Sequence, residues 1–172
     1  MKKLLLMAAI AVFGFTAVAQ DSPSADNGGF NLGINLGLPV GDAGDGWTFN
    51  VSLDLSYLWE VSDVFGAGIA TGYSHSFGDS IDFFGESFDV EDAGFIPLAG
   101  VARFNVSDDF ILGADLGYAI GVSPSDNDGG FYYAPRIQYG VSESIDIVLA
   151  YRGISVDGGS FDVLTLGVEF GL

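Results

Sequence analysis

The stretch that decides the fold is the last one, residues 161–172, which reads F-D-V-L-T-L-G-V-E-F-G-L. Its even positions from 164 onward are bulky and apolar, whereas the odd positions from 165 onward are Thr, Gly, Glu and Gly. A period of two predicts a β-strand with two unlike faces. An apolar face opposite a small or polar face without lysine is typical of a transmembrane strand, with its apolar side in lipid and its small side in a narrow lumen. The residues expected to face lipid are Leu164, Leu166, Val168 and Phe170.

The other end of the chain has the layout of an export signal. Residues 1–20 read M-K-K-L-L-L-M-A-A-I-A-V-F-G-F-T-A-V-A-Q, with two lysines, an apolar run and small residues at 17–19. This predicts a secretory signal peptide over residues 1–19, cleaved after Ala19. The alternative, a membrane anchor, needs about 20 consecutive apolar residues, more than this run provides. Residues 20–172 are then expected to form a single exported domain.

Composition narrows the class of protein further. The chain has 23 Asp and Glu against 5 Lys and Arg. Both lysines lie in the predicted signal peptide, so its cleavage would remove them. Such an acidic chain is expected to bind no nucleic acid, and to contact anionic lipid phosphates only through divalent cations. There is no Cys, which excludes a lipid-attachment cysteine, a disulfide and a thiolate metal site. The mean hydropathy is nevertheless +0.41, as expected when apolar residues are spread over many barrel strands.

The same alternation recurs in seven earlier segments. With the C-terminal strand, the expected strands cover residues 30–38, 47–59, 64–77, 94–104, 110–120, 131–139, 145–152 and 161–172. Pro97 interrupts the fourth of them and predicts an unpaired N–H or a bulge there. In the second, Trp47 and Trp59 are twelve residues apart, about 40 Å of strand or about 30 Å of height in a tilted barrel. That height separates two aromatic girdles, whose expected members are Trp47, Tyr57, Trp59, Tyr118, Tyr139 and Tyr151.

The connections indicate how the strands are joined. Three are short and similar in sequence, at residues 60–63, 105–108 and 140–143, and they alternate with four longer ones at 40–46, 76–92, 122–130 and 155–160. Short turns at one end and longer loops at the other are typical of outer-membrane barrels with periplasmic turns. The predicted fold is therefore all-β, an eight-stranded antiparallel up-and-down transmembrane β-barrel.

With its export signal, eight alternating strands, V-S-[D/E] turns and a C-terminal strand with an apolar face, the chain resembles the small outer-membrane β-barrel family of the OmpX and OmpA-membrane-domain type. The resemblance covers essentially all of residues 20–172 and is one of pattern more than of a discriminating motif. It implies a location in the bacterial outer membrane, contact with outer-membrane lipid, and insertion by the barrel-assembly machinery.

Charged residues on the small face are expected inside the barrel. They are Arg103, Arg136, Arg152, Asp54, Asp115, Asp146 and Glu169. An eight-stranded barrel is just wide enough for side chains to fill it, so these charges should pair into a polar network that occludes the lumen. We expect Arg136 to pair with Asp115, and Arg103 to lie level with Asp146 and Glu169. The alternative is a selectivity constriction of a narrow solute channel, because several inward glycines leave room.

His75 is the single candidate for acid–base chemistry, with Ser74 and Ser76 beside it and Asp79 nearby. Neighbouring strand residues face opposite ways, which makes a serine–histidine pair a weak signal. The expectation is therefore no enzyme, no catalytic residue, no metal site and no cofactor. The family resemblance also includes barrel enzymes that modify lipid A, and such an enzyme is the least favoured alternative. It predicts loss of activity in His75→Ala.

The acidic loop at residues 76–92 is the longest and carries phenylalanines among its carboxylates. Its six acids are Asp79, Asp82, Glu86, Asp89, Glu91 and Asp92. They are expected to keep the surface solvated, and a further hypothesis is that they bind divalent cations or partner proteins. The overall prediction is a small, monomeric, non-enzymatic outer-membrane barrel with a structural or surface-interaction role. A soluble exported β-barrel ligand binder, with its large residues inside, is the competing architecture.

Overall fold

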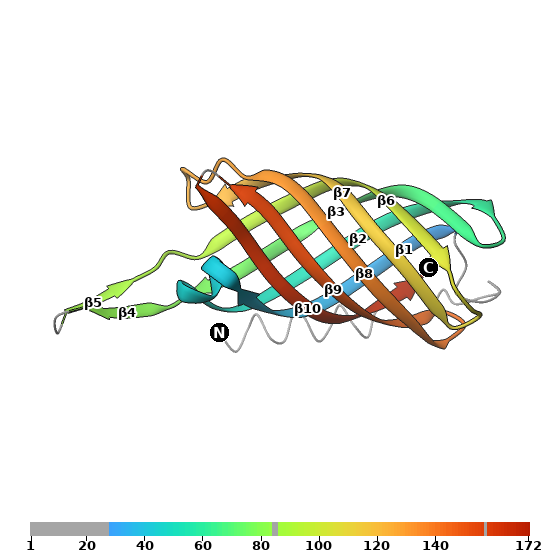
Figure 1. The fold of residues 1–172 in the computed structure, drawn as a ribbon, viewed down its shortest axis with the longest axis horizontal. Helices are drawn as coiled ribbons and strands as arrows, with labels where there is room; N and C mark the ends of the chain where they lie inside the picture. Colours follow the sequence, from blue (N-terminus) through green and yellow to red (C-terminus); the bar gives the residue numbers. More distant parts are fainter. Residues whose placement is uncertain (1–27, 84–85, 157) are drawn as a thin grey trace.

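The computed structural model of the protein describes residues 28–83, 86–156 and 158–172. In this part of the chain eight strands form a closed barrel with the neighbour order β1-β10-β9-β8-β7-β6-β3-β2 (Figure 1). The barrel strands are β1 (Gly29–Val40), β2 (Trp47–Ser62), β3 (Phe65–Gly78), β6 (Ala93–Asn105), β7 (Phe110–Ser123), β8 (Gly130–Ser142), β9 (Ile145–Val156) and β10 (Gly159–Gly171). Every pairing is antiparallel. The predicted eight-stranded up-and-down barrel is confirmed.

Two elements lie in the long connections. The 3-10 helix η1 (Gly41–Asp45) joins β1 to β2, and the hairpin of β4 (Ser80–Phe83) and β5 (Glu86–Asp89) joins β3 to β6. Figure 1 shows this hairpin projecting beyond one end of the barrel, with the other long connections at the same end and the short turns at the opposite end. The predicted signal peptide lies outside the described residues. No helix within those residues has the length and apolar character needed to cross a membrane.

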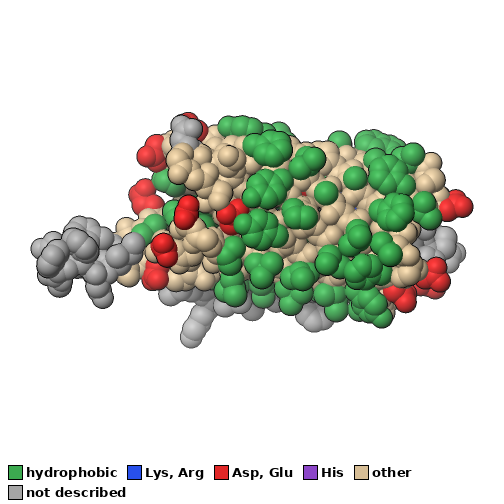
Figure 2. All heavy atoms as spheres, in the orientation of Figure 1, with side chains coloured by type: hydrophobic (Ala, Val, Ile, Leu, Met, Phe, Trp, Pro, Cys, Tyr) green, Lys and Arg blue, Asp and Glu red, His purple; other side chains and the backbone are tan. Residues whose placement is uncertain are grey.

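The apolar face of the strands points outward. Leu36 and Leu166 are 55% and 58% exposed, whereas Glu169 on the opposite face of β10 is 5% exposed. Val168 and Phe170 are half-buried on the outer side. Figure 2 shows hydrophobic side chains spread over the wall of the barrel and acidic side chains at both ends. Large residues outside and charges inside contradict the soluble ligand binder, whose apolar residues would fill the interior.

Trp47 differs from its prediction as a girdle residue. A bulge shifts the β2–β3 register between the pairs Trp47–Gly78 and Phe49–Phe77, and one extra residue in a strand reverses the faces beyond it. Trp47 therefore packs on the buried Phe161, with ring centroids 4.9 Å apart. The other predicted girdle residues do lie on the outer wall: Trp59, Tyr118 and Tyr139 are exposed, and Tyr57 and Tyr151 are half-buried.

Pro97 disturbs the sheet as expected. The β3–β6 register runs from the pair Thr71–Leu98 to the pair Ser74–Phe95 without pairs at the two intervening positions. Proline has no N–H to donate there. A register shift between Gly94 and Phe95 follows on the β7 side. The irregularity thus falls at the loop end of β6, where the connection to the projecting hairpin begins.

Candidate functional site: the barrel lumen

The lumen contains two layers of different chemistry. At the loop end most of the buried residues are apolar, beside the polar Asn50 and Ser76. The buried apolar cluster consists of Ala43, Ala93, Phe95, Ala99, Ala119, Tyr132, Ala134, Ile154, Phe161 and Val163, with Trp47 and Val156 packed against it. We call this the apolar seal. Below it, toward the turn end, lie the predicted charged residues. Arg103, Arg136, Arg152, Asp115 and Glu169 are all buried.

Arg103 and Asp115 make one close ion pair. Arg103 Nη1 donates to Asp115 Oδ1 at 2.6 Å, between the adjacent strands β6 and β7. Gly113 faces the same part of the lumen, where an added Cβ would lie 2.8 Å from Arg103 Cδ and 3.0 Å from Arg136 Cγ. The glycine therefore leaves the space that both arginine side chains occupy. Arg103, which was expected to lie level with Asp146 and Glu169, thus makes its close ion pair with Asp115.

Arg136 and Glu169 make the second close pair. Arg136 Nη2 donates to Glu169 Oε2 at 2.6 Å, whereas the Arg136–Asp115 distance is 3.9 Å. The predicted Arg136–Asp115 partnership is therefore only the weaker contact of this guanidinium. The reason is that the Arg136 side chain on β8 extends past the neighbouring β9 to β10, a contact that the pairing of adjacent strands does not reveal. Gln138 completes the group by donating to Glu169 at 2.8 Å and to Asp146 at 3.3 Å.

Arg152 and Asp54 make the third pair. Arg152 Nη1 donates to Asp54 Oδ1 at 2.9 Å and Nη2 donates to Oδ2, so the contact is bidentate. Asn35 and Thr165 hydrogen-bond to the two partners. Asn35, Gln138 and Thr165 were absent from the predicted set because only charged residues were singled out, although each lies at an inward position of its strand. The alternation of inward and outward positions, which placed the charged residues in the lumen, would have found these three polar residues as well.

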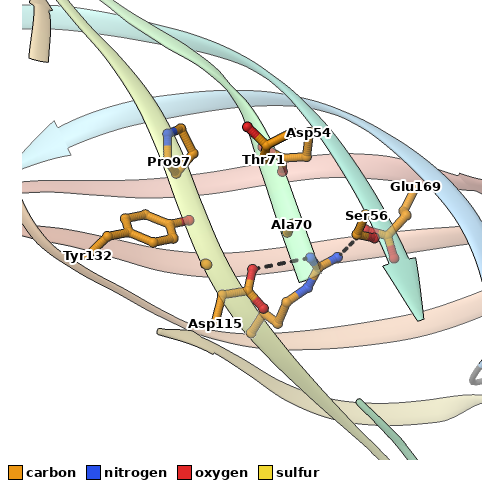
Figure 3. A pocket seen from close by; sticks show the side chains of 10 residues that line it. Asp54, Ser56, Ala70, Thr71, Pro97, Asp115, Tyr132 and Glu169 are labelled. Carbon is orange, nitrogen blue, oxygen red and sulfur yellow. Dashed lines mark hydrogen bonds and ion pairs between the residues drawn. The ribbon is translucent and has the colours of Figure 1, made fainter. Parts of the chain in front are cut away.

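A small cavity lies within this network (Figure 3). Its volume is about 10 Å³, and its lining includes Tyr132, Asp115, Arg136, Glu169 and Asp54. A space of this size holds at most about one water molecule. In Figure 3 the dashed lines run from Asp115 and Glu169 to the arginine between them, at one side of the cavity. Side chains from β2, β7, β8 and β10 thus meet around this cavity.

His75 lies on the outer wall near the loop end of β3. Its Nδ1 is 3.1 Å from the Tyr73 hydroxyl and its Nε2 is 3.1 Å from Asp92 Oδ2. The neighbouring Ser74 and Ser76 point the other way and accept hydrogen bonds from Asn50 inside the barrel. The structure therefore brings His75 together with a tyrosine and an aspartate, and it separates the histidine from both adjacent serines.

The acidic residues of the longest loop remain spread out. Asp79, Asp89, Glu91 and Asp92 are exposed. In the ranges that the structure describes, no three acidic, histidine or cysteine side chains converge as ligands for a metal ion. The side chains of Asp82 and Glu86 lie outside what the structure describes.

Comparisons with solved structures agree with this architecture. The Yersinia pestis outer membrane protein Ail, in a phospholipid bilayer nanodisc, superposes with a TM-score of 0.59 at 16% identity, over 84% of this chain and 99% of that one. The de novo designed protein TMB2.3 gives a TM-score of 0.54 at 17% identity, over 89% and 98%. The outer membrane enzyme PagL gives 0.50 at 15% identity, over 83% and 99%. At these identities the similarity establishes the fold alone.

Sequence comparison identifies the family. No curated protein matches the chain. A family model described as the outer membrane protein beta-barrel domain matches residues 6–171, which is nearly the whole sequence. The match agrees with the closed barrel, its apolar outer wall and its charged interior, and it indicates the bacterial outer membrane as the location. The chain belongs to the outer membrane protein beta-barrel domain family.

Proposed function

We propose that this protein is a non-enzymatic outer-membrane barrel with a largely occluded lumen and a structural or surface-interaction role. The observation that carries the proposal is the pair of stacked layers in the lumen. The apolar seal fills much of the loop end with buried apolar side chains, and the three ion pairs below it surround a cavity of about 10 Å³. A conducting pore needs a continuous polar path, which two successive layers of side chains interrupt.

Solute flux across lipid vesicles tests this proposal. The purified barrel, reconstituted into vesicles, is expected to admit arabinose no faster than protein-free vesicles, with a general porin as the positive control. A second preparation carries Phe161→Ala and Arg136→Ala, one truncation in each layer, and is expected to admit more sugar than the parent. Sugar entry through the unmodified barrel would contradict the occluded lumen and support the alternative of a narrow solute channel.

The enzyme alternative rests on the Tyr73–His75–Asp92 hydrogen-bond chain, because a base held between a hydroxyl and a carboxylate is a recurring catalytic arrangement. Against an enzyme, the His75–Asp92 pair is accessible to solvent, with side-chain exposures of 26% for His75 and 47% for Asp92. We expect outer-membrane glycolipid incubated with the reconstituted protein to keep all its acyl chains in mass spectrometry. Loss of acyl chains with the parent, abolished in His75→Gln, would establish an enzyme instead.

Export and assembly complete the proposal. We propose that residues 1–19 are a signal peptide removed after Ala19, that residues 20–172 form the barrel domain, and that the barrel-assembly machinery inserts it as a monomer. The lysines, apolar run and small residues at 17–19 support this cleavage site. Edman sequencing of the protein from isolated outer membranes is expected to begin at Gln20. A first residue elsewhere would move the domain boundary.

The loop at residues 76–92 is proposed as the surface that meets divalent cations or partner proteins. Its described acids are exposed at the end of the barrel from which the β4–β5 hairpin projects (Figure 1). A variant with all six loop acids changed to Asn or Gln is expected to lose calcium-dependent retention on glycolipid vesicles. Unchanged retention would remove the cation role, and unchanged partner recovery after cross-linking would remove the protein role.

A further inference from the structure

The barrel is closed by a contact between the two ends of the sequence. Strand β1 pairs with β10 from Asn31–Gly171 to Val40–Asp162. The other strand pairs are formed by strands that follow one another along the barrel chain, whereas β1 and β10 are separated by the whole domain. Closing so long a loop carries a larger entropic cost than closing a hairpin. We call the β1–β10 contact the seam.

One ion pair spans the seam inside the lumen. Arg152 on β9 and Asp54 on β2 bond across the two strands between them, by a bidentate contact. On the near side Arg152 Nε donates to Thr165 Oγ1 of β10 at 3.3 Å, and on the far side Asn35 Nδ2 of β1 donates to Asp54 Oδ2 at 2.9 Å. Thr165 also donates to the Ala150 carbonyl at 3.2 Å. Four consecutive strands, β9, β10, β1 and β2, are therefore connected by side chains.

Glycines make room for this group at the seam. Asn35 pairs in register with Gly167, and a Cβ on that glycine would overlap the Asn35 amide. Asp54 pairs with Gly33, where a Cβ would lie 3.3 Å from the Asp54 Cβ. The side chains thus occupy space that their partners in the ladder leave empty. A register slip of one residue would turn Asn35 to the lipid face, and a slip of two would place it opposite a residue with a side chain.

We infer that Asn35, Asp54, Arg152 and Thr165 form a latch that holds the seam closed and fixes its register. A bidentate arginine–carboxylate pair is directional, and in the buried lumen it is screened little by salt. Opening the seam would separate Asp54 from Arg152 and leave both charges unpaired, at a cost much greater than that of separating two apolar side chains. Closure of the barrel at the seam therefore depends on the hydrogen bonds among these four side chains.

The Arg103–Asp115 pair provides a matched control. It is also buried and bonded at 2.6 Å, but it joins β6 and β7, strands connected by a short turn on the far side of the barrel from the seam. Asp54→Asn removes the carboxylate charge from Arg152, and Asp115→Asn removes it from Arg103 and, at 3.9 Å, from Arg136. Only the former removes a bond that spans the seam.

Hydrogen–deuterium exchange of the reconstituted barrel, read peptide by peptide, tests the latch. In Asp54→Asn we expect amides of β1 and β10 to exchange about tenfold faster, with β6 and β7 within about twofold of the parent. Asp115→Asn should leave the seam amides unchanged. Thr165→Val, which removes one neutral member of the latch, should accelerate exchange of the same amides by a smaller factor. This variant provides the test if Asp54→Asn does not fold. Equal acceleration around the barrel in Asp54→Asn or in Thr165→Val, or an unchanged seam, would overturn the inference.

Discussion

Trp47 and Trp59 begin and nearly end the same strand, yet they lie on opposite sides of the barrel wall. Trp47 packs on Phe161 in the interior and donates its indole N–H to the Glu91 carbonyl at 3.1 Å. Trp59 packs on Tyr57 on the outer wall, with centroids 5.1 Å apart. Their even spacing of twelve predicts one face, and the bulge at the start of β2 separates them. One tryptophan therefore belongs to the apolar seal and the other to the lipid boundary.

This separation is visible by fluorescence, because the chain contains only two tryptophans. In vesicles with brominated acyl chains, Trp47→Phe retains Trp59 and should be strongly quenched. Trp59→Phe retains Trp47 and should keep most of its emission, since the barrel wall separates Trp47 from lipid. Equal quenching of the two variants would place Trp47 on the outer wall.

Removing Arg136 should destabilise the barrel substantially. Arg136→Gln leaves the buried Glu169 without its charged partner, which costs roughly 3–5 kcal/mol of unfolding free energy. The measurement is urea unfolding in lipid vesicles, followed by gel mobility without heating. Glu143→Gln in an exposed turn is the control and should change stability by less than about 0.5 kcal/mol. Arg136→Met combined with Glu169→Leu should recover much of the loss, since replacing both members by apolar groups is often nearly neutral. A double variant no more stable than Arg136→Gln would contradict the pairing.

Gly153 on the outer wall is covered by the ring of Tyr133. The two residues pair across β8 and β9, and a Cβ at Gly153 would overlap the tyrosine ring. The Tyr133 hydroxyl donates a hydrogen bond to Asp162 Oδ1 at 3.4 Å. Gly153→Ala should therefore displace Tyr133, weaken this hydrogen bond and cost about 1–3 kcal/mol. Gly100→Ala, also on the outer wall but with its nearest atom at 3.9 Å, should be nearly neutral. In a Tyr133→Ala background the cost of Gly153→Ala should disappear, and a persistent cost would show that the ring is not its cause.

A charge on the outer wall should be penalised according to depth in the membrane. Leu166 lies near the middle of β10 and Val61 near the turn end of β2, and both are more than half exposed. Leu166→Arg should cost roughly 2–4 kcal/mol of unfolding free energy in lipid, whereas Val61→Arg should cost about 0–1 kcal/mol. Equal costs would mean that the wall between these two levels does not meet hydrocarbon.

Periodicity alone predicted the strands, their faces and the closed barrel. The alternation in β2 and β10 reports which side of the wall each residue occupies, and an eight-stranded ring leaves little freedom beyond that. The same parity correctly put Arg103, Arg136 and Arg152 on the inner face, because lipid would exclude them. It failed for Trp47, because the extra residue at the bulge, Thr48, reversed the count.

The partners inside the lumen were harder to predict, because they depend on distances across the barrel. Arg136 and Asp115 are close in the ladder, yet the closest partner of Arg136 is Glu169, from a strand that is not its neighbour. The space left by Gly113 and the curvature of the wall decide which charges meet. The position of a residue along its strand predicts its height in the barrel. Which charges pair also depends on where the strands lie around the barrel and how far each side chain extends.

Arg103, Arg136 and Arg152 are buried, so their positive charges do not offset the negative charge of the exposed surface. Apart from His75, every charged side chain that the described barrel presents to water is a carboxylate. Two copies approaching in the plane of the membrane therefore repel one another over roughly a Debye length, about 8 Å at physiological ionic strength. The neutralising counter-ions must come from the medium, so crowding of this protein in the membrane should respond to magnesium and calcium concentration.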